Sequence, residues 1–349
     1  MVRFGIIGFG LHAVKRLVPG FRMAQNARLV ALSRREPERA QASAREFGVP
    51  LAFDSAEKMC RSPEVDAVFV ATPNACHRDD ELLALKCGKP VLCEKPMGMN
   101  AKECREMVEA AQRARLPLGV AQIFRFADMV NKLRARVAAG DIGKVVFARS
   151  EFSFLGRGHV RTWMTDKAVA GGGPIADVGV HCIDTLRYLL QDEVARVHAS
   201  GFSDADSGAV EAAANLSLEF PSGALGAALV SFRADYRTPL ELVGEGGVLR
   251  AQDGLTVDRP VTLELLRGGK VIDSEPASNQ QAYALQVDAF ADAVEGKADF
   301  PAPGEEGWKN QLVLDAAYRS LRSGRSEEVG TIKGGSKPVR RRTARGRRA

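Results

Sequence analysis

Residues 2–13 read Val2-Arg3-Phe4-Gly5-Ile6-Ile7-Gly8-Phe9-Gly10-Leu11-His12-Ala13. The apolar residues up to Ile7 are typical of a short buried strand, and a helix is expected to continue from Ala13. The pattern between them is G-x-G-x-x-A. Its first glycine makes a tight turn, its second lets the backbone approach a pyrophosphate, and its small third residue packs the helix on the strand. The stretch therefore predicts a dinucleotide-binding turn, with the N-terminus of the helix facing the phosphates.

Strand and helix patterns alternate through the first 122 residues. This alternation predicts an α/β Rossmann domain with a parallel sheet over residues 1–122. From residue 123 the pattern changes to closely spaced strands with few helices between them, which predicts an α+β domain with an open, mostly antiparallel sheet over 123–330. A length of 349 residues also favours two domains. The strand-like runs after the first lie at 28–32, 65–71, 91–93 and 118–122.

The formal charge of +6 comes from the C-terminal segment. Residues 331–349 hold eight Lys or Arg and no acid, so the rest of the chain carries a formal charge of −2. We expect this segment to be a disordered basic tail that aids solubility, and nucleic acid is not favoured as a partner. No apolar run reaches the ~18 residues of a membrane span, and the N-terminus shows no secretory signal. The six cysteines form no C-x-x-C pair, which favours reduced thiols in a cytoplasmic protein.

Further turns follow predicted strand ends, where open parallel sheets bind their ligands. Ser33-Arg34-Arg35 follows the strand at 28–32, where an NAD enzyme usually places an acid, and its two guanidinium groups suit the 2′-phosphate of NADP. The alternative is that both arginines are solvated and that either NAD or NADP is used. Thr72-Pro73-Asn74 and Glu94-Lys95-Pro96 follow two later strands. The expected cofactor-binding residues are Gly8, Phe9, Gly10, Leu11, His12, Ser33, Arg34, Arg35, Thr72, Pro73, Asn74, His77, Glu94 and Lys95.

A helix that begins near Pro174 shows an unusual polar face. Three glycines at 171–173 precede it, and proline is tolerated in the first helical turn. A rotation of about 100° per residue gathers four polar residues on one face and apolar residues on the opposite face. Such a face is typical of the wall of a site, because a solvated surface would show Lys, Glu and Gln. The alternative is a helix at the edge of the core whose histidine is only hydrogen-bonded. The polar residues are Asp177, His181, Asp184 and Tyr188.

Six motifs occur in order along nearly the whole chain except the tail. They are Gly8-Phe9-Gly10, Thr72-Pro73-Asn74 with His77, Glu94-Lys95-Pro96, Phe124-Arg125-Phe126, Gly140-Asp141-Ile142-Gly143-Lys144, and Gly171-Gly172-Gly173 with Asp177, Gly179, His181 and Asp184. This ordered set resembles the Gfo/Idh/MocA oxidoreductases, the glucose-fructose oxidoreductase and inositol dehydrogenase family. The chain departs from the family at Ala127-Asp128, where many relatives have a proline nearby. The resemblance implies a nucleotide-binding domain joined to a domain whose open sheet serves in homodimer or homotetramer contacts.

The resemblance also implies that Lys95, Asp177 and His181 occupy the catalytic positions of the family. Oxidation of a secondary alcohol needs a base for the hydroxyl proton while hydride leaves the same carbon. His181 suits this role because an unperturbed imidazole has a pKa of about 6.5, and Asp177, one turn earlier, can orient it. Lys95 would donate a hydrogen bond to the substrate oxygen. No metal is required, and the sequence shows no metal-ligand cluster.

Other polar and aromatic residues are expected near the substrate. Asp184 lies on the same helix face and is expected to contact a substrate hydroxyl, with a surface carboxylate as the alternative. Trp163, which follows His159 and Arg161 in a glycine-bearing loop, would suit a polyol as an aromatic plate, with simple packing as the alternative. His198 is expected to be structural. The expected substrate-binding residues are Lys95, Arg125, Trp163, Asp177, His181 and Asp184.

Together these features predict an NAD(P)-dependent dehydrogenase or reductase. The expected cofactor is NADP, with NAD as the alternative, and the expected substrate is a secondary alcohol or ketone of a sugar, cyclitol or similar small polyol. One alternative function is a cofactor-sensing binding protein without turnover, against which the intact Lys95, Asp177 and His181 argue. Another is a glycoside hydrolase that uses NAD transiently. It would release sugar without a net change in nicotinamide absorbance.

Overall fold

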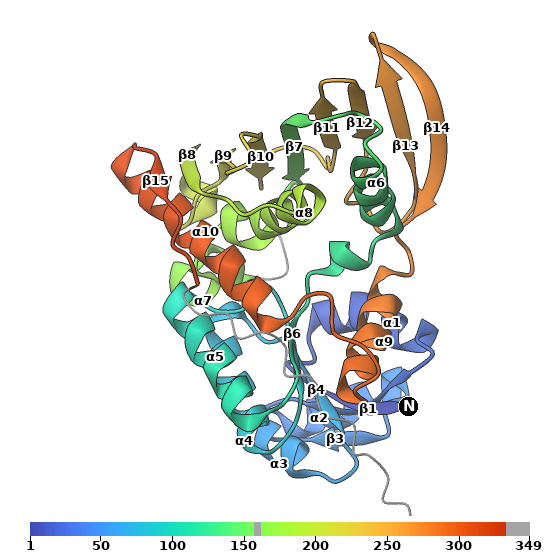
Figure 1. Cartoon of the computed structure of the whole chain (residues 1–349). Coiled ribbons are helices and arrows are strands. Elements are labelled where there is room, and N and C mark those ends of the chain that lie inside the picture. The colour runs from blue at the N-terminus through green and yellow to red at the C-terminus, as the bar shows by residue number, and fades with distance from the viewer. Residues whose placement is uncertain (157–161, 333–349) are drawn as a thin grey trace, which may run out of the picture.

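The computed structural model describes residues 1–156 and 162–332 of the chain (Figure 1). The expectations for His159, Arg161 and the basic residues from 333 onward fall outside this range. The chain forms two sheets, one in each half of the molecule; helices flank the first sheet and cover one face of the second. No helix in the described part of the chain is long and apolar enough to cross a membrane.

The first sheet is parallel, which confirms the predicted Rossmann fold. Its strands lie in the order β3-β2-β1-β4-β5-β6. The strand order reverses between β1 and β4, so the loops after these two strands meet at the position where open α/β sheets bind ligands. The strands are β1 (Val2–Ile7), β2 (Ala27–Ser33), β3 (Leu51–Phe53), β4 (Ala67–Val70), β5 (Val91–Cys93) and β6 (Leu118–Val120).

Helices connect these strands, and two C-terminal helices return to the same domain. Figure 1 shows α9 (Ala282–Val294) beside α1, and α10 (Gly304–Ser323) beside α5. The C-terminal part of the chain therefore packs against the nucleotide-binding fold as well as against the second sheet. The connecting segments are η1 (Ala13–Leu17), α1 (Val18–Met23), α2 (Pro37–Phe47), α3 (Ala56–Arg61), η2 (Asn74–Cys76), α4 (His77–Lys86) and α5 (Ala101–Ala114).

The second sheet is open and mostly antiparallel, as predicted. Its strand order is β14-β13-β12-β11-β7-β10-β9-β8-β15, and β7 and β10 form its parallel pair. Buried and exposed residues alternate along the neighbouring strands β8, β9 and β10, because helices cover one face of the sheet. The strands are β7 (Val145–Ser153), β8 (Arg196–Phe202), β9 (Ala213–Glu219), β10 (Leu225–Ser231), β11 (Leu240–Gly244), β12 (Gly247–Ala251), β13 (Pro260–Arg267), β14 (Lys270–Ser278) and β15 (Glu327–Glu328).

The helix expected from Pro174 is present, but its surroundings differ from the expectation. It starts as a π-helical segment, η5 (Ile175–Gly179), and continues as α8 (Val180–Leu190). α8 lies between the second sheet and the helices α6 and α10, so its polar side is buried along with its apolar side. The remaining segments of this half are η3 (Ile123–Phe126), α6 (Asp128–Ala138), η4 (Thr162–Thr165), α7 (Lys167–Ala170) and η6 (Ala205–Ser207).

Candidate active site

A cavity of about 590 Å³ opens at the carboxyl ends of the parallel strands. Its walls come from the segments after β1, β2, β3, β4 and β5, and Trp163 and Asp177 of the second half of the chain complete it. Because the strands are parallel, these loops share one edge of the sheet. The structure brings every residue of the expected cofactor set to this cavity. They are Gly8, Phe9, Gly10, Leu11, His12, Ser33, Arg34, Arg35, Thr72, Pro73, Asn74, His77, Glu94 and Lys95.

Two glycines shape the loop after β1. Gly8 has a φ of +85°, and a Cβ there would lie 2.6 Å from the backbone nitrogen of Thr72 in the loop after β4. A side chain at Gly8 would therefore separate the two loops. At Gly10 a Cβ would meet only the Gly8 carbonyl oxygen, at 3.9 Å, so this part of the backbone borders open space. Backbone N–H groups beside such an opening can accept a phosphate.

The end of β2 places several arginines near the cavity. Arg34 donates from Nη1 to Ser43 Oγ at 2.9 Å, which holds its side chain against α2. Arg35 lines the cavity together with Arg39, whose Nε lies 2.9 Å from the Glu36 carboxylate. The sequence interpretation missed Arg39. Its position in the first turn of the helix that directly follows Arg34-Arg35 is the signal that could have identified it.

The loop after β5 is tied to the glycine turn and to the loop after β4. His12 Nε2 lies 2.8 Å from Glu94 Oε1. Burial raises the pKa of Glu94, but the attraction of His12 and Lys95 outweighs this effect and sets the pKa at about 2. The buried His77 contacts the Thr72 carbonyl oxygen through Nε2 at 2.8 Å and the Pro96 carbonyl oxygen through Nδ1 at 2.9 Å. Glu94 and Lys95 are therefore held on both sides.

Lys95 and Asp177 join the two halves of the chain inside the cavity. Lys95 Nζ donates to the backbone carbonyl oxygen of Asp177 at 2.8 Å and to its Oδ1 at 3.1 Å. The two side chains are 13% and 18% exposed, so their attraction is only partly screened. Nearby, Asn74 Nδ2 donates to the carbonyl oxygen of Ala170 at 2.8 Å, which adds a second polar contact between the halves. The structure thus brings Lys95 against the turn that carries Asp177.

His181 lies four residues after Asp177, in apolar surroundings, and it is not among the residues that line the cavity. Its ring lies 5.0 Å from the Phe124 ring, edge to face, and 6.1 Å from the Phe152 ring. Nδ1 is buried and finds no hydrogen-bond partner among the described residues. Burial lowers the pKa of His181, and the positive charge of Lys95 lowers it further, against the opposing effect of Asp177, to about 3. The imidazole is therefore neutral near pH 7.

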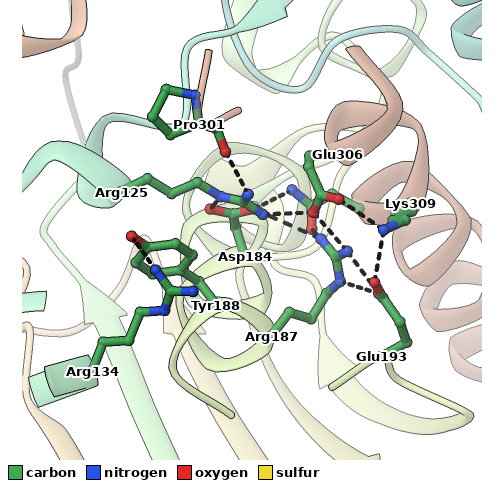
Figure 2. A network of polar contacts seen from close by, with 10 residues as sticks. Arg125, Arg134, Asp184, Arg187, Tyr188, Glu193, Pro301, Glu306 and Lys309 are labelled. Carbon is green, nitrogen blue, oxygen red and sulfur yellow. Dashed lines mark hydrogen bonds and ion pairs between the residues drawn. The ribbon is translucent and has the colours of Figure 1, made fainter. Parts of the chain in front are cut away.

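Arg125 and Asp184, which were expected to contact substrate, are hydrogen-bonded to each other in the structure. Figure 2 shows Arg125 donating to both carboxylate oxygens of Asp184 through Nε and Nη2, at 2.7 to 3.2 Å, and to Glu306 at 2.7 Å. Asn310 also donates to Asp184, at 2.8 Å. The Arg125 and Asp184 side chains are 6% and 2% exposed, and neither residue lines the cofactor cavity. Because α8 is covered on this side, the buried carboxylate of Asp184 needs a cation as its partner, and Arg125 supplies it.

Arg187 extends this network along α8. It donates to Glu306 at 2.9 Å and to Asn310 at 2.6 Å, and Figure 2 shows the contacts converging between α8 and the first turn of α10. Burial raises the pKa of Glu306, but Arg187 and Arg125 overcome this and hold it at about 2. The network therefore links η3, α8 and α10 through charged side chains. It belongs to the framework around the cavity.

Trp163 and a few residues that the sequence interpretation missed complete the walls. Trp163 lies in η4 and lines the cavity together with Asp177. Cys76 and Asp80 line it from the start of α4, and Asp80 accepts a hydrogen bond from Thr72 Oγ1 at 2.8 Å. Within residues 1–156 and 162–332, no three His, Cys, Asp or Glu side chains are grouped to hold a metal ion.

Comparison with known proteins identifies the family. Residues 2–122 match the model of an oxidoreductase family with an NAD-binding Rossmann fold, and residues 130–250 match the GFO/IDH/MocA C-terminal domain. The chain belongs to the GFO/IDH/MocA oxidoreductase family. This confirms the resemblance drawn from the motifs. As a member of this family, the protein is an NAD(P)-dependent oxidoreductase.

Several characterised relatives cover almost the whole chain. A 1,5-anhydro-D-fructose reductase of Ensifer adhaerens is 32% identical over 336 residues, which span 95% of this chain and 99% of the relative. A D-xylose 1-dehydrogenase (NADP(+)) of Haloferax volcanii is 30% identical, with 93% and 99% coverage. The crystal structure of an aldose-aldose oxidoreductase from Caulobacter crescentus, complexed with glycerol, superposes with a TM-score of 0.87 at 26% identity, covering 94% of this chain and 99% of that one.

The protonation of His181 gives a test of the site that needs no substrate. Because its pKa lies at about 3, the imidazole signals of His181 are expected to stay unchanged in an NMR titration from about pH 8 to about pH 5. The variant His181→Gln assigns the signals by their loss. An inflection of these signals near pH 6.5 would show that the ring is not desolvated.

The same shift has a consequence for stability. The unfolded chain binds a proton at His181 near pH 6.5, whereas the folded chain does so only near pH 3, so acidification between these values favours the unfolded state. His181→Gln is therefore expected to lose less stability than the wild type between about pH 7 and about pH 4. Urea unfolding at both pH values measures the difference.

Proposed function

We propose that this oxidoreductase moves hydride between NADP and the carbinol or carbonyl carbon of a sugar or a related small polyol. The observation that carries the proposal is the contact of Lys95 with Asp177 beside the cofactor cavity, with a neutral His181 next to it. The named substrates of the relatives, 1,5-anhydro-D-fructose and D-xylose, support a sugar as the substrate class.

The residues of the cavity fit a nicotinamide dinucleotide. The open space beside Gly10 suits a pyrophosphate, and the loops after β2 and β4 would hold the adenosine ribose and the nicotinamide side. When bound, the nicotinamide ring supplies the hydride acceptor or donor. Arg35 and Arg39 suit a 2′-phosphate, since Glu36, the acid nearest in sequence, lies against Arg39.

Lys95 and His181 would carry out the proton transfer and charge stabilisation at the substrate oxygen. Two of the three N–H groups of Lys95 donate to Asp177, which leaves one for a substrate oxygen. In alcohol oxidation His181 would accept the hydroxyl proton as a neutral base, and negative charge developing on the oxygen would favour its protonated form. Lys95 would stabilise that same developing charge. In carbonyl reduction the groups act in reverse.

Turnover with sugars tests this proposal directly. Sugars, cyclitols and their keto derivatives are incubated with NADPH, NADP, NADH or NAD, and nicotinamide absorbance is expected to change in step with substrate conversion. Lys95→Met and His181→Gln are each expected to lower kcat by about 10² to 10⁴-fold, because each removes a proton donor or acceptor at the reacting oxygen. The exposed His198→Gln serves as the control and should keep full activity.

Two other outcomes would replace the proposal. Release of sugar from glycosides without a net change in absorbance would make the protein a hydrolase. Tight binding of the nucleotide with no conversion of any compound would make it a cofactor-sensing protein. Unchanged kcat in either variant would remove that residue from the mechanism.

Substitution of the arginines that follow β2 tests the preference for NADP over NAD. The double variant Arg35→Ala/Arg39→Ala is expected to bind NADPH at least about tenfold more weakly while NADH binding changes little, because charge-assisted bonds to the 2′-phosphate are lost. Arg45→Ala, on the exposed side of the same helix, is the matched control. Fluorescence titration with both nucleotides gives the dissociation constants. Tighter binding of NADH than of NADPH by the wild type would contradict the preference for NADP.

We also propose that the uncovered face of the second sheet pairs two copies of the chain. Phe147 of β7 and Leu225 of β10 are neighbours in register and are 52% and 49% exposed, and the half-buried Val243 of β11 lies on the other side of Phe147. An apolar row at the centre of a sheet is typical of a face that is covered in an assembly.

Charge introduced on this face is expected to separate the copies. Phe147→Lys/Leu225→Lys should shift the mass measured by light scattering from a dimer or tetramer toward the monomer, because two ammonium groups would be buried in the contact. Leu285→Lys, which alters an exposed leucine on α9, should leave the mass unchanged. A wild-type protein that is monomeric at micromolar concentration would refute the proposal.

A further inference from the structure

The helix that carries Asp177 has its first turn anchored by a side chain from elsewhere in the chain. The backbone N–H groups of Gly173 and Ile175 both donate to Glu211 Oε1, at 3.0 and 2.9 Å. Pro174, between them, has no N–H to satisfy. Glu211 is 5% exposed and lies between η6 and β9, far from this turn in sequence. Its carboxylate therefore accepts the free donors that open the helix, where negative charge is favourable.

Tyr318 of α10 fixes the same carboxylate oxygen. Its hydroxyl donates to Glu211 Oε1 at 3.0 Å. The glycines before the helix make room for both residues: a Cβ at Gly172 would lie 1.6 Å from the Tyr318 hydroxyl, and a Cβ at Gly173 would lie 2.2 Å from the Glu211 carbonyl oxygen. These two glycines thus serve close packing, in addition to the backbone freedom inferred from the sequence.

The backbone of this turn contacts Lys95 directly. One of the two hydrogen bonds from Lys95 Nζ goes to the backbone carbonyl oxygen of Asp177, so it follows the backbone of the turn itself. The Asp177 N–H in turn donates to the Gly173 carbonyl oxygen at 3.0 Å, which connects the anchored residue to Asp177. Neither Glu211 nor Tyr318 lines the cofactor cavity.

We propose that Glu211 and Tyr318 are positioning residues that hold the first turn of the helix and thereby set Asp177 against Lys95. For its effect on turnover, the inference rests on the proposed dehydrogenase function. Its geometric part concerns only the environment of Lys95. The two parts can therefore be measured separately.

Three variants distinguish the loss of a hydrogen bond to the turn from the loss of side-chain volume. Glu211→Ala removes the acceptor, Glu211→Gln keeps an oxygen acceptor of the same shape, and Tyr318→Phe keeps the ring but loses one donor. Glu219→Ala, on the exposed side of the following strand β9, is the matched control. Since a displacement of about 1 Å can cost about 10²-fold, Glu211→Ala is expected to lower kcat by about 10 to 10²-fold. The smaller change Tyr318→Phe should lower it severalfold, and Glu211→Gln should recover most of the activity lost in Glu211→Ala.

A second readout needs no substrate. Competitive acetylation of lysines, followed by mass spectrometry, reports how firmly Lys95 is held, with the exposed Lys102 as an internal reference. The labelling rate of Lys95 is expected to rise severalfold in Glu211→Ala and to stay near the wild-type rate in Glu211→Gln. KM and the dissociation constant for NADPH should change by less than about threefold, because the cavity walls are untouched.

The outcomes are distinct. Wild-type Lys95 labelling in both Glu211→Ala and Tyr318→Phe overturns the inference, whatever reaction the enzyme catalyses. Failure of the wild type to convert any sugar refutes the proposed function but leaves the labelling result to decide the geometry. If Glu211→Ala does not fold, Tyr318→Phe carries the test, and unchanged kcat and labelling in that variant overturn the inference.

Discussion

The structure of the site depends on one contact, between the ammonium group of Lys95 and the first turn of the helix that carries Asp177. The two partners come from opposite halves of the chain, and each is fixed from its own side. The residues next to Lys95 are tied to neighbouring loops through His12 and His77, and Asp177 follows a turn that Glu211 anchors. Because little solvent reaches the pair, a small shift of either partner changes their attraction strongly.

The cofactor half of the site could be predicted from the sequence because its information is local. Each expected residue lies just after an apolar strand, and parallel strands bring their carboxyl ends to one edge whatever the rest of the chain does. Gly8 illustrates this: its positive φ and its closeness to Thr72 follow from a strand, a tight turn and the neighbouring strand. The closely spaced strand patterns after residue 123 predicted a second domain, and the family matches over residues 2–122 and 130–250 confirm the two-domain fold.

The parts that the sequence could not supply are set by contacts between distant segments. Helical periodicity predicted a polar face on this helix, but it could not say that α6 and α10 cover α8. Asp184 was therefore expected at the substrate, whereas in the structure it accepts hydrogen bonds from Arg125. Glu211 and Tyr318 carry no motif and lie far apart in sequence, and only the fold brings them to the glycine turn. The same holds for the lowered pKa of His181, which depends on the rings packed around it.

Arg125, Asp184 and Glu306 form a network of charged side chains that is buried beside α8. A buried ion network is seldom more stable than apolar residues of the same shape, because desolvation offsets the attraction. The network instead fixes geometry. The planar guanidinium group of Arg125 can bind Asp184 and Glu306 only over a narrow range of their positions. Phe124 directly precedes Arg125 and packs edge to face on His181, one turn before Asp184 on the same helix. The ion pair therefore holds the residue next to Phe124, whose ring forms part of the apolar surroundings that lower the pKa of His181.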